Sequence, residues 1–249
     1  MEILAGFTAV QIAAALAATF VSAFVRGLAG FGMAILLVPI LALALSPVEA
    51  VLVTNVLALM IGLSEIRTIL REAEKSALVI GGLVLVATLP GLVALASTPE
   101  NLARFLIALV ALSAFAAILL PQRGAAQPGP LVTGAVGISS GLLTGFAGMP
   151  GPPVVPYYVG RAIPRVTAKA SMLLIFTIAS FAGLSSGVAI GVMEWRLLLF
   201  GLMLFPAVLV GNWLGAKAFG KVNDALWRGF VAFTLAAAAI AALVKLLQG

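Results

Sequence analysis

Long apolar stretches are the sequence feature that most restricts the fold of this chain. Runs of about 20 residues, rich in Leu, Ala and Val, follow one another, and only 9% of the 249 residues are charged. A soluble domain carries roughly 25% charged residues, so this chain cannot cover its apolar surface with a single core. Its solvent must be lipid, where only helices or closed barrels satisfy their backbone hydrogen bonds. The runs show no alternation of period two, which predicts an all-α polytopic membrane protein.

The residue types that are missing exclude several kinds of chemistry. The chain has no Cys, no His and only eight acidic residues. We therefore expect no catalytic residues, no enzymatic activity, no cofactor and no metal site. Basic loops on one side of a membrane explain the net charge of +6 better than nucleic acid does. The expected partners are a small solute and the lipid bilayer, with no nucleic acid, and the sequence indicates no oligomeric state.

Two glycine-rich breaks interrupt the apolar runs. The first is Arg26-Gly27-Leu28-Ala29-Gly30-Phe31-Gly32-Met33, and the second is Thr144-Gly145-Phe146-Ala147-Gly148-Met149-Pro150-Gly151-Pro152. Glycine inside a helix costs roughly 1 kcal/mol relative to Ala, so both breaks suit a backbone that unwinds or turns sharply. The arm that follows the first break, residues 33–45, would reach only about 20 Å, which is less than the roughly 30 Å hydrocarbon core.

The second half of the chain repeats the first. With two one-residue gaps, the matching positions are Gly27 with Gly145, Gly30 with Gly148, Pro39 with Pro156, Pro47 with Pro164, Thr54 with Ser171 and Pro90 with Pro206. We predict a first repeat over 1–120, a linker over 121–130 and a second repeat over 131–249. The first holds a broken segment at about 6–45 and helices at about 47–69, 77–96 and 102–120; the second holds a broken segment at about 131–160 and helices at about 164–190, 195–218 and 224–246.

The breaks permit two topologies. Each broken segment could be one kinked span, which gives parallel repeats, or a re-entrant hairpin beside three transmembrane helices, which gives inverted-topology repeats. With hairpins, Arg104, Arg196 and Lys245 lie on one face, and ten basic residues gather on the other: Arg67, Arg71, Lys75, Arg123, Arg161, Arg165, Lys169, Lys217, Lys221 and Arg228. The positive-inside rule favours this arrangement, with both termini periplasmic or extracellular in a bacterial-type inner membrane. Inverted repeats with broken helices are typical of secondary transporters.

The hairpin tips are the predicted binding site. The short arms would begin inside the membrane, near the midplane, and would direct free N–H groups and positive dipole ends into a polar cavity, which favours an anion. Close helix packing is the alternative explanation for an isolated glycine, but the duplicated break favours binding. The tip candidates are Gly30, Phe31, Gly32, Gly148, Met149 and Gly151.

Four polar side chains could complete this site. Arg26 would bind an anion if the first tip lies inside the membrane, whereas it would be a cytoplasmic anchor if the first arm spans fully. Thr54 and Asn55 in the first half and Ser171 in the second lie at matching places. They could donate hydrogen bonds to the same cavity or could bond neighbouring helices instead.

At these residues the chain resembles the TauE/SafE family of sulfite exporters. The resemblance rests on residues 27–39 and 47–55 and recurs at 145–156 and 164–171, so that it covers essentially the whole chain. It implies transport, commonly export, of sulfite, a sulfonate or another organosulfur or carboxylate anion. We therefore expect a secondary transporter with alternating access between the two tips; an anion channel that uses the same hairpins is the alternative.

Overall fold

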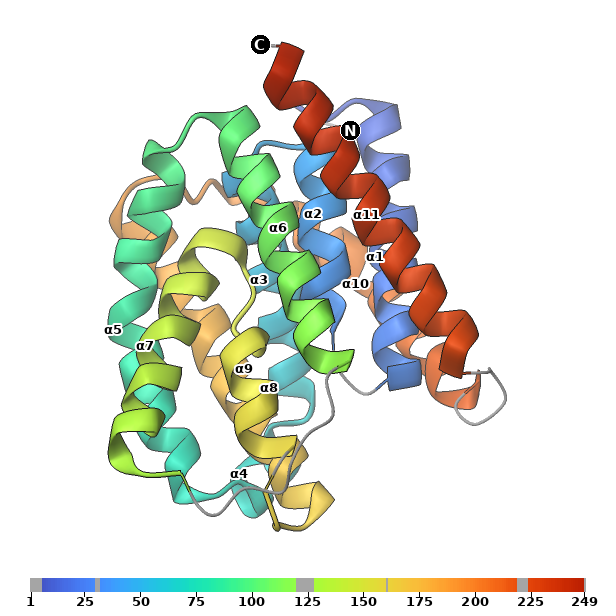
Figure 1. Ribbon diagram of the computed structural model, residues 1–249. Coiled ribbons are helices and arrows are strands. Elements are labelled where there is room, and N and C mark those ends of the chain that lie inside the picture. Colours follow the sequence, from blue (N-terminus) through green and yellow to red (C-terminus); the bar gives the residue numbers. More distant parts are fainter. Residues whose placement is uncertain (1–5, 30–31, 120–127, 160, 219–223, 249) are drawn as a thin grey trace. The chain divides into compact units, whose positions relative to one another are not determined.

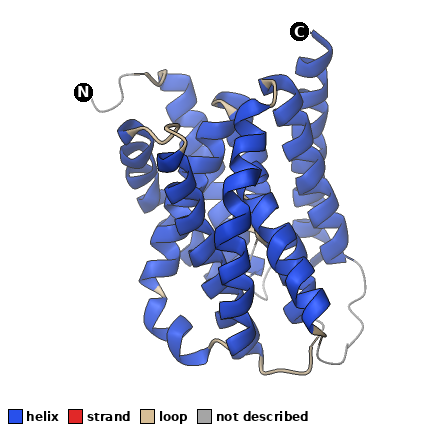
Figure 2. Ribbon diagram, turned by 90° about the vertical axis from the view of Figure 1, so that its left-hand side faces the viewer, coloured by secondary structure: helices blue, strands red, loops and turns tan. Residues whose placement is uncertain are grey.

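The structure of the protein is a computed structural model that describes residues 6–29, 32–119, 128–159, 161–218 and 224–248 (Figure 1). Its regular elements are α1 (Ala9–Ala29), α2 (Met33–Ala44), α3 (Pro47–Ser64), α4 (Ile66–Glu72), α5 (Lys75–Ser97), α6 (Glu100–Leu119), α7 (Pro130–Ala147), α8 (Gly151–Val159), α9 (Arg165–Ala189), α10 (Trp195–Ala218) and α11 (Asp224–Gln248). Among these described residues no strand is present (Figure 2). Seven helices in the described part are long and apolar enough to cross a membrane, namely α1, α3, α5, α7, α9, α10 and α11. The predicted all-α polytopic membrane fold is confirmed.

One expected helix is divided. The sequence predicted a single helix over 47–69, but α3 ends at Ser64 and α4 begins at Ile66. Between them Glu65 leaves the helical conformation, with φ −103° and ψ 6°. The Ser64 hydroxyl donates to the carbonyl oxygen of Ile61 at 2.7 Å. The backbone N–H of Glu65 is shared between the carbonyl oxygens of Ile61 and Gly62, at 3.3 and 3.2 Å, which marks the end of α3 at this place.

The chain forms two compact units, and each unit combines segments from both predicted repeats. Unit 1 comprises Met1–Leu57, Thr98–Ser113 and Glu194–Gly249. Unit 2 comprises Ala58–Ser97 and Ala114–Met193. In unit 1, α1 therefore packs against α10, and in unit 2, α5 packs against α7 and α9. The repeat boundaries themselves stay a prediction from the sequence.

Glycines bring the main helix pairs of each unit into backbone contact. In unit 1, a Cβ atom added to Gly27 would lie 2.2 Å from the carbonyl oxygen of Asn212 in α10. In unit 2, a Cβ atom added to Gly145 would lie 2.1 Å from the carbonyl oxygen of Thr88 in α5. Small residues permit transmembrane helices to approach this closely. Gly27 and Gly145, which match each other in the repeat, therefore serve helix packing.

Both broken segments fold back on themselves. In unit 1, the Gln11 side chain near the start of α1 donates to the carbonyl oxygen of Ala44, the last residue of α2, at 2.7 Å. In unit 2, the hydroxyl of Thr133, early in α7, lies 3.0 Å from that of Tyr157, late in α8. The start of each first arm thus lies beside the end of its second arm. A kinked span would separate these ends by the full membrane thickness of roughly 30 Å, so the contacts favour the hairpin.

Candidate functional site

The first break leads into α2. Two of its predicted tip residues, Gly30 and Phe31, lie outside the described residues. Gly32 precedes the helix with φ 95° and ψ 5°, a left-handed conformation that favours glycine. Because Gly32 carries no side chain, it offers no side-chain acceptor to the N–H groups of the first turn. The 12 residues of α2 are about 18 Å long, so its amino end lies that far from its end at Ala44.

Hydrogen bonds within the hairpin hold the backbone of the second break. Gly148 ends α7 with φ 65° and ψ 19°, as is common for a glycine that terminates a helix. Its N–H donates to the carbonyl oxygen of Thr144 at 2.9 Å. The Ser140 hydroxyl donates to the carbonyl oxygen of Pro150 at 2.7 Å, and the Met149 side chain is buried. From Gly151, the nine residues of α8 extend about 14 Å.

Arg26 is a buried helix residue. It lies within α1, which continues to Ala29, and only 9% of its surface is exposed. Its Nη1 atom donates to Oδ1 of Asn212 in α10 at 2.8 Å. It lies 17 residues after Ala9, the first residue of α1, which corresponds to about 26 Å along the helix. The structure therefore places Arg26 among packed helices and not in a loop, while its role as an anion ligand stays a prediction.

Thr54, Asn55 and Ser171 are all buried but differ in their hydrogen bonds. In the described part of the chain, Oγ1 of Thr54 and Nδ2 of Asn55 have no hydrogen-bond partner. Oγ of Ser171 instead accepts the backbone N–H of Glu74, between α4 and α5, at 3.0 Å. Ser171 therefore makes the structural hydrogen bond that the sequence left open as an alternative. Thr54 and Asn55 keep buried donors that have no partner within the described residues.

Three further polar residues of unit 1 were not among the candidates from the sequence, namely Thr19, Ser22 and Asn212. Thr19 and Ser22 are fully buried in α1, and their hydroxyls lack a partner within the described residues. Asn212 holds Arg26, as described above. The spacing of Thr19, Ser22 and Arg26, at i, i+3 and i+7, places them on one helix face. This polar stripe in an apolar helix could have been found in the sequence.

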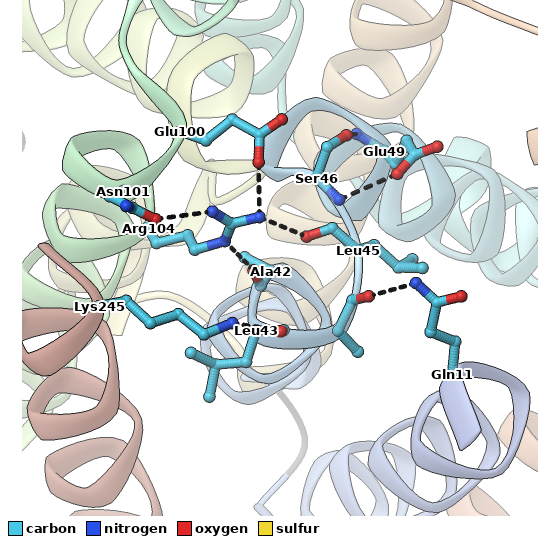
Figure 3. Close-up of polar contacts among 11 residues, drawn as sticks. Gln11, Ala42, Leu43, Leu45, Ser46, Glu49, Glu100, Asn101, Arg104 and Lys245 are labelled. Atoms are coloured by element: carbon cyan, nitrogen blue, oxygen red, sulfur yellow. Dashed lines mark hydrogen bonds and ion pairs between the residues drawn. The ribbon is translucent and has the colours of Figure 1, made fainter. Parts of the chain in front are cut away.

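The carboxyl end of α2 is held by side chains from three helices (Figure 3). These side chains are Gln11 from α1, Arg104 from α6 and Lys245 from α11. Their acceptors are four consecutive carbonyl oxygens: Ala42 and Leu45 for Arg104 at 2.7 and 3.4 Å, Leu43 for Lys245 at 2.9 Å, and Ala44 for Gln11 at 2.7 Å. They satisfy the carbonyl groups that a helix end leaves free, and the two cations suit the negative end of its dipole. These three side chains, which we call the clamp, therefore fix α2 at the end opposite the break.

Ion pairs fix the neighbouring segments in each unit. In unit 1, Arg196 at the start of α10 pairs with Glu49 at 2.6 Å and with Glu194 at 2.5 Å. The hydrogen bond from Arg196 holds the pKa of the exposed Glu194 carboxyl below its ordinary value. In unit 2, Arg161 pairs with Glu74. The three basic residues assigned by the sequence to the less basic face, namely Arg104, Arg196 and Lys245, all therefore have structural partners.

A family model described as sulfite exporter TauE/SafE matches residues 14–242, which is most of the chain. The comparison with curated proteins and the comparison with solved structures found no match. The family match and the seven apolar helices indicate a multi-pass membrane protein that transports sulfite or related sulfur-containing anions. The chain belongs to the sulfite exporter TauE/SafE family.

Proposed function

We propose that this protein is a secondary transporter that exports a small oxyanion, such as sulfite, a sulfonate or another organosulfur or carboxylate anion. The observation that carries the proposal is that in both hairpins a short helix begins at a glycine-containing break. From their own carboxyl ends, α2 and α8 reach about 18 Å and 14 Å, or roughly half of a 30 Å hydrocarbon core. Free N–H groups at the start of α2 favour an anion, whereas the first turn of α8 offers fewer of them, because Pro152 and Pro153 carry no N–H.

Family membership and the buried polar residues of unit 1 support the same function. Arg26, Thr54 and Asn55 bring a guanidinium group, a hydroxyl and an amide into the interior of a chain that is 63% hydrophobic. Polar groups inside a membrane are expensive and commonly mark a substrate path. The prediction that both tips serve one anion in an alternating-access cycle rests on the sequence repeat.

The orientation in the membrane is part of this proposal. The ten basic residues that the hairpin topology collects on one face place that face in the cytoplasm by the positive-inside rule. Both termini would then lie on the periplasmic side of a bacterial-type inner membrane. Cysteine residues introduced at positions 6 and 248 of the cysteine-free chain would report this orientation. A membrane-impermeant maleimide should label both in intact spheroplasts, and protection of both would contradict the proposed orientation.

Transport in proteoliposomes tests the proposed function. Vesicles that contain the full chain should release sulfite faster than empty vesicles, and unlabelled sulfite inside should drive the uptake of labelled sulfite from outside. Counterflow distinguishes a carrier from the channel alternative, because a channel does not couple the two fluxes. Sulfite, a short alkyl sulfonate and acetate, each tested separately, would define the substrate class. An absence of flux for all three anions would contradict the proposal.

A further inference from the structure

Four buried polar groups in unit 1 have no hydrogen-bond partner within the described residues. They are Oγ1 of Thr19 and Oγ of Ser22 in α1, and Oγ1 of Thr54 and Nδ2 of Asn55 in α3. At most 2% of the surface of each of these residues is exposed. Buried polar groups in proteins almost always have a partner, so four such groups in one unit require an explanation.

Comparable buried hydroxyls in other helices are satisfied. Each donates to the carbonyl oxygen four residues earlier, at 2.7 or 2.8 Å, and these residues are Thr88, Thr144, Thr177 and Ser180. A helical Ser or Thr can make this bond within its own helix. Among the described residues, Thr19, Ser22 and Thr54 do not make it. Their hydroxyl groups therefore remain able to donate to another molecule.

By helix rise, the four groups lie about 11 to 20 Å along their own helices, counted from the start of each helix. The contact of Gln11 with Ala44 places the start of α1 and the end of α2 together, and Ser46 leads directly into α3 (Figure 3). From that end, the helix rise places Thr19 and Ser22 about 15 and 20 Å along α1 and places Thr54 and Asn55 about 11 and 12 Å along α3. The amino end of α2, at about 18 Å, lies in the same band.

Two neighbouring faces of α1 differ in their contacts: one packs against the glycines of α10, and the other carries polar side chains. The residues of α1 that meet the glycines of α10 are Phe20, Ala23, Phe24 and Leu28. Thr19, Ser22 and Arg26 form the neighbouring stripe, because a helix advances 100° per residue. The stripe is nevertheless buried inside the protein. Close packing against the glycines of α10 therefore does not account for Thr19 and Ser22, whereas Arg26 bonds Asn212 of α10.

We propose that Thr19, Ser22, Thr54 and Asn55 are the hydrogen-bond donors with which unit 1 recognises its substrate. This inference rests on the proposed transport of an anion and names the residues that bind it. Hydroxyl groups can donate, and an amide Nδ2 can only donate, so the matching ligand carries several acceptor oxygens. A head group with three oxygens on one central atom, as in sulfite or a sulfonate, fits four donors better than a carboxylate or a halide.

The test compares two variants of these donors with two matched controls. The variants are Ser22→Ala and Thr54→Val. Ser140→Ala is the control for Ser22→Ala, since Ser140 lies 118 positions later, as Gly145 does from Gly27, and bonds Pro150. Thr177→Val is the control for Thr54→Val, since Thr177 bonds the carbonyl oxygen of Leu173. Two quantities are measured on the full chain: the sulfite concentration for half-maximal flux, and the melting temperature with and without sulfite or methanesulfonate.

The two groups of variants should behave in opposite ways. Ser22→Ala and Thr54→Val should raise the half-saturating sulfite concentration about tenfold or more, because a hydrogen bond to a charged group is lost. They should also lose the increase in melting temperature that sulfite produces, while the melting temperature without anion is unchanged or higher. Ser140→Ala and Thr177→Val should lower the melting temperature without anion and keep the half-saturating concentration.

Two results would overturn the inference. If Ser22→Ala and Thr54→Val keep both the half-saturating concentration and the stabilisation by sulfite, these hydroxyls bind only buried water. If neither sulfite nor methanesulfonate stabilises the wild-type protein, unit 1 holds no such site. Failure of the transport function is a separate result, in which wild-type vesicles show no flux although the anion-dependent melting temperature persists.

Discussion

The two glycine breaks match in sequence, yet the polar residues around them differ. In unit 2, Ser140 and Thr144 donate to carbonyl oxygens of their own hairpin, so the break is satisfied internally. In unit 1, the matching position of Ser140 is Ser22, whose hydroxyl has no partner among the described residues. On the proposal made above, unit 1 supplies the groups that recognise a ligand, whereas these two hydroxyls of unit 2 hold the backbone of their own hairpin.

Close helix packing at glycine should be equally important for stability in both units. In Gly145→Val the added Cβ would lie 2.1 Å from the carbonyl oxygen of Thr88, and in Gly27→Val it would lie 2.2 Å from that of Asn212, so both side chains would clash with backbone. We expect each to lower the free energy of unfolding by about 4 kcal/mol or more, or to prevent folding. Reversible unfolding in SDS would measure this loss. Gly134→Val in α7 is the control, because no described atom lies within 4 Å of its added Cβ; equal losses for Gly134→Val and Gly145→Val would contradict the packing role.

The hydrogen bond of Arg26 should make the next largest contribution to the free energy of unfolding. It is specific to unit 1, because the matching residue in unit 2 is Thr144. Asn212→Ala removes the amide oxygen that Arg26 donates to. We expect a loss of about 1.5–3 kcal/mol, typical of a hydrogen bond to a charged group. Asn101→Ala is the control, because Arg104 also bonds Ala42 and Glu100 and should retain its position. Equal stability of the two variants in SDS titration would show that Asn212 does not hold Arg26.

Substitution of the glycines with positive φ should show whether the shape of the breaks affects transport independently of stability. Gly148→Ala and Gly32→Ala force a side chain into a backbone with positive φ, which costs roughly 1–2 kcal/mol. Gly191→Ala, with φ 75° between α9 and α10, carries the same strain outside both breaks. All three variants should therefore lose similar stability, but only the first two should slow sulfite flux at saturation. Normal flux in Gly148→Ala and Gly32→Ala would show that the shape of the breaks does not matter for transport.

The clamp at the carboxyl end of α2 should give the smallest effect. Lys245→Met removes one cation from the helix end and should lower the free energy of unfolding by about 0.3–1 kcal/mol. The half-saturating sulfite concentration should not change, because the clamp lies at the end opposite the break. Lys75→Met, at an exposed position, should change the stability by less than about 0.5 kcal/mol. If Lys245→Met alters the half-saturating concentration tenfold, the clamp reaches the substrate.

The sequence predicted most of the fold because apolar runs, glycines and prolines are local features. Gly148 and Pro47 mark helix boundaries in the structure by their own backbone preferences, whereas α1 and α7 continue to Ala29 and Ala147, inside the stretches predicted as breaks. The sequence missed the division at Glu65, because no glycine or proline marks that position and only the backbone angles of Glu65 show that the helix ends there. It did not predict that each compact unit combines helices from both predicted repeats, because such pairing depends on contacts between segments that are distant in the sequence.

The candidate site was harder to predict for the same reason. Arg26 is held by a residue 186 positions later, which no local pattern reveals. Ser171 and Thr54 match in sequence, but only the structure shows that Ser171 accepts the N–H of Glu74 while Thr54 has no partner in the described part of the chain. Whether a buried hydroxyl is satisfied depends on tertiary contacts, and the sequence could therefore name polar candidates without ranking them.

The most direct test of this account is an experimental structure of the full chain with bound sulfite. The account predicts density for the anion in unit 1, within hydrogen-bond distance of the Ser22 and Thr54 hydroxyls, while Ser140 in unit 2 keeps its bond to Pro150. Density for sulfite that contacts none of Thr19, Ser22, Thr54 and Asn55 would contradict the assignment of recognition to unit 1.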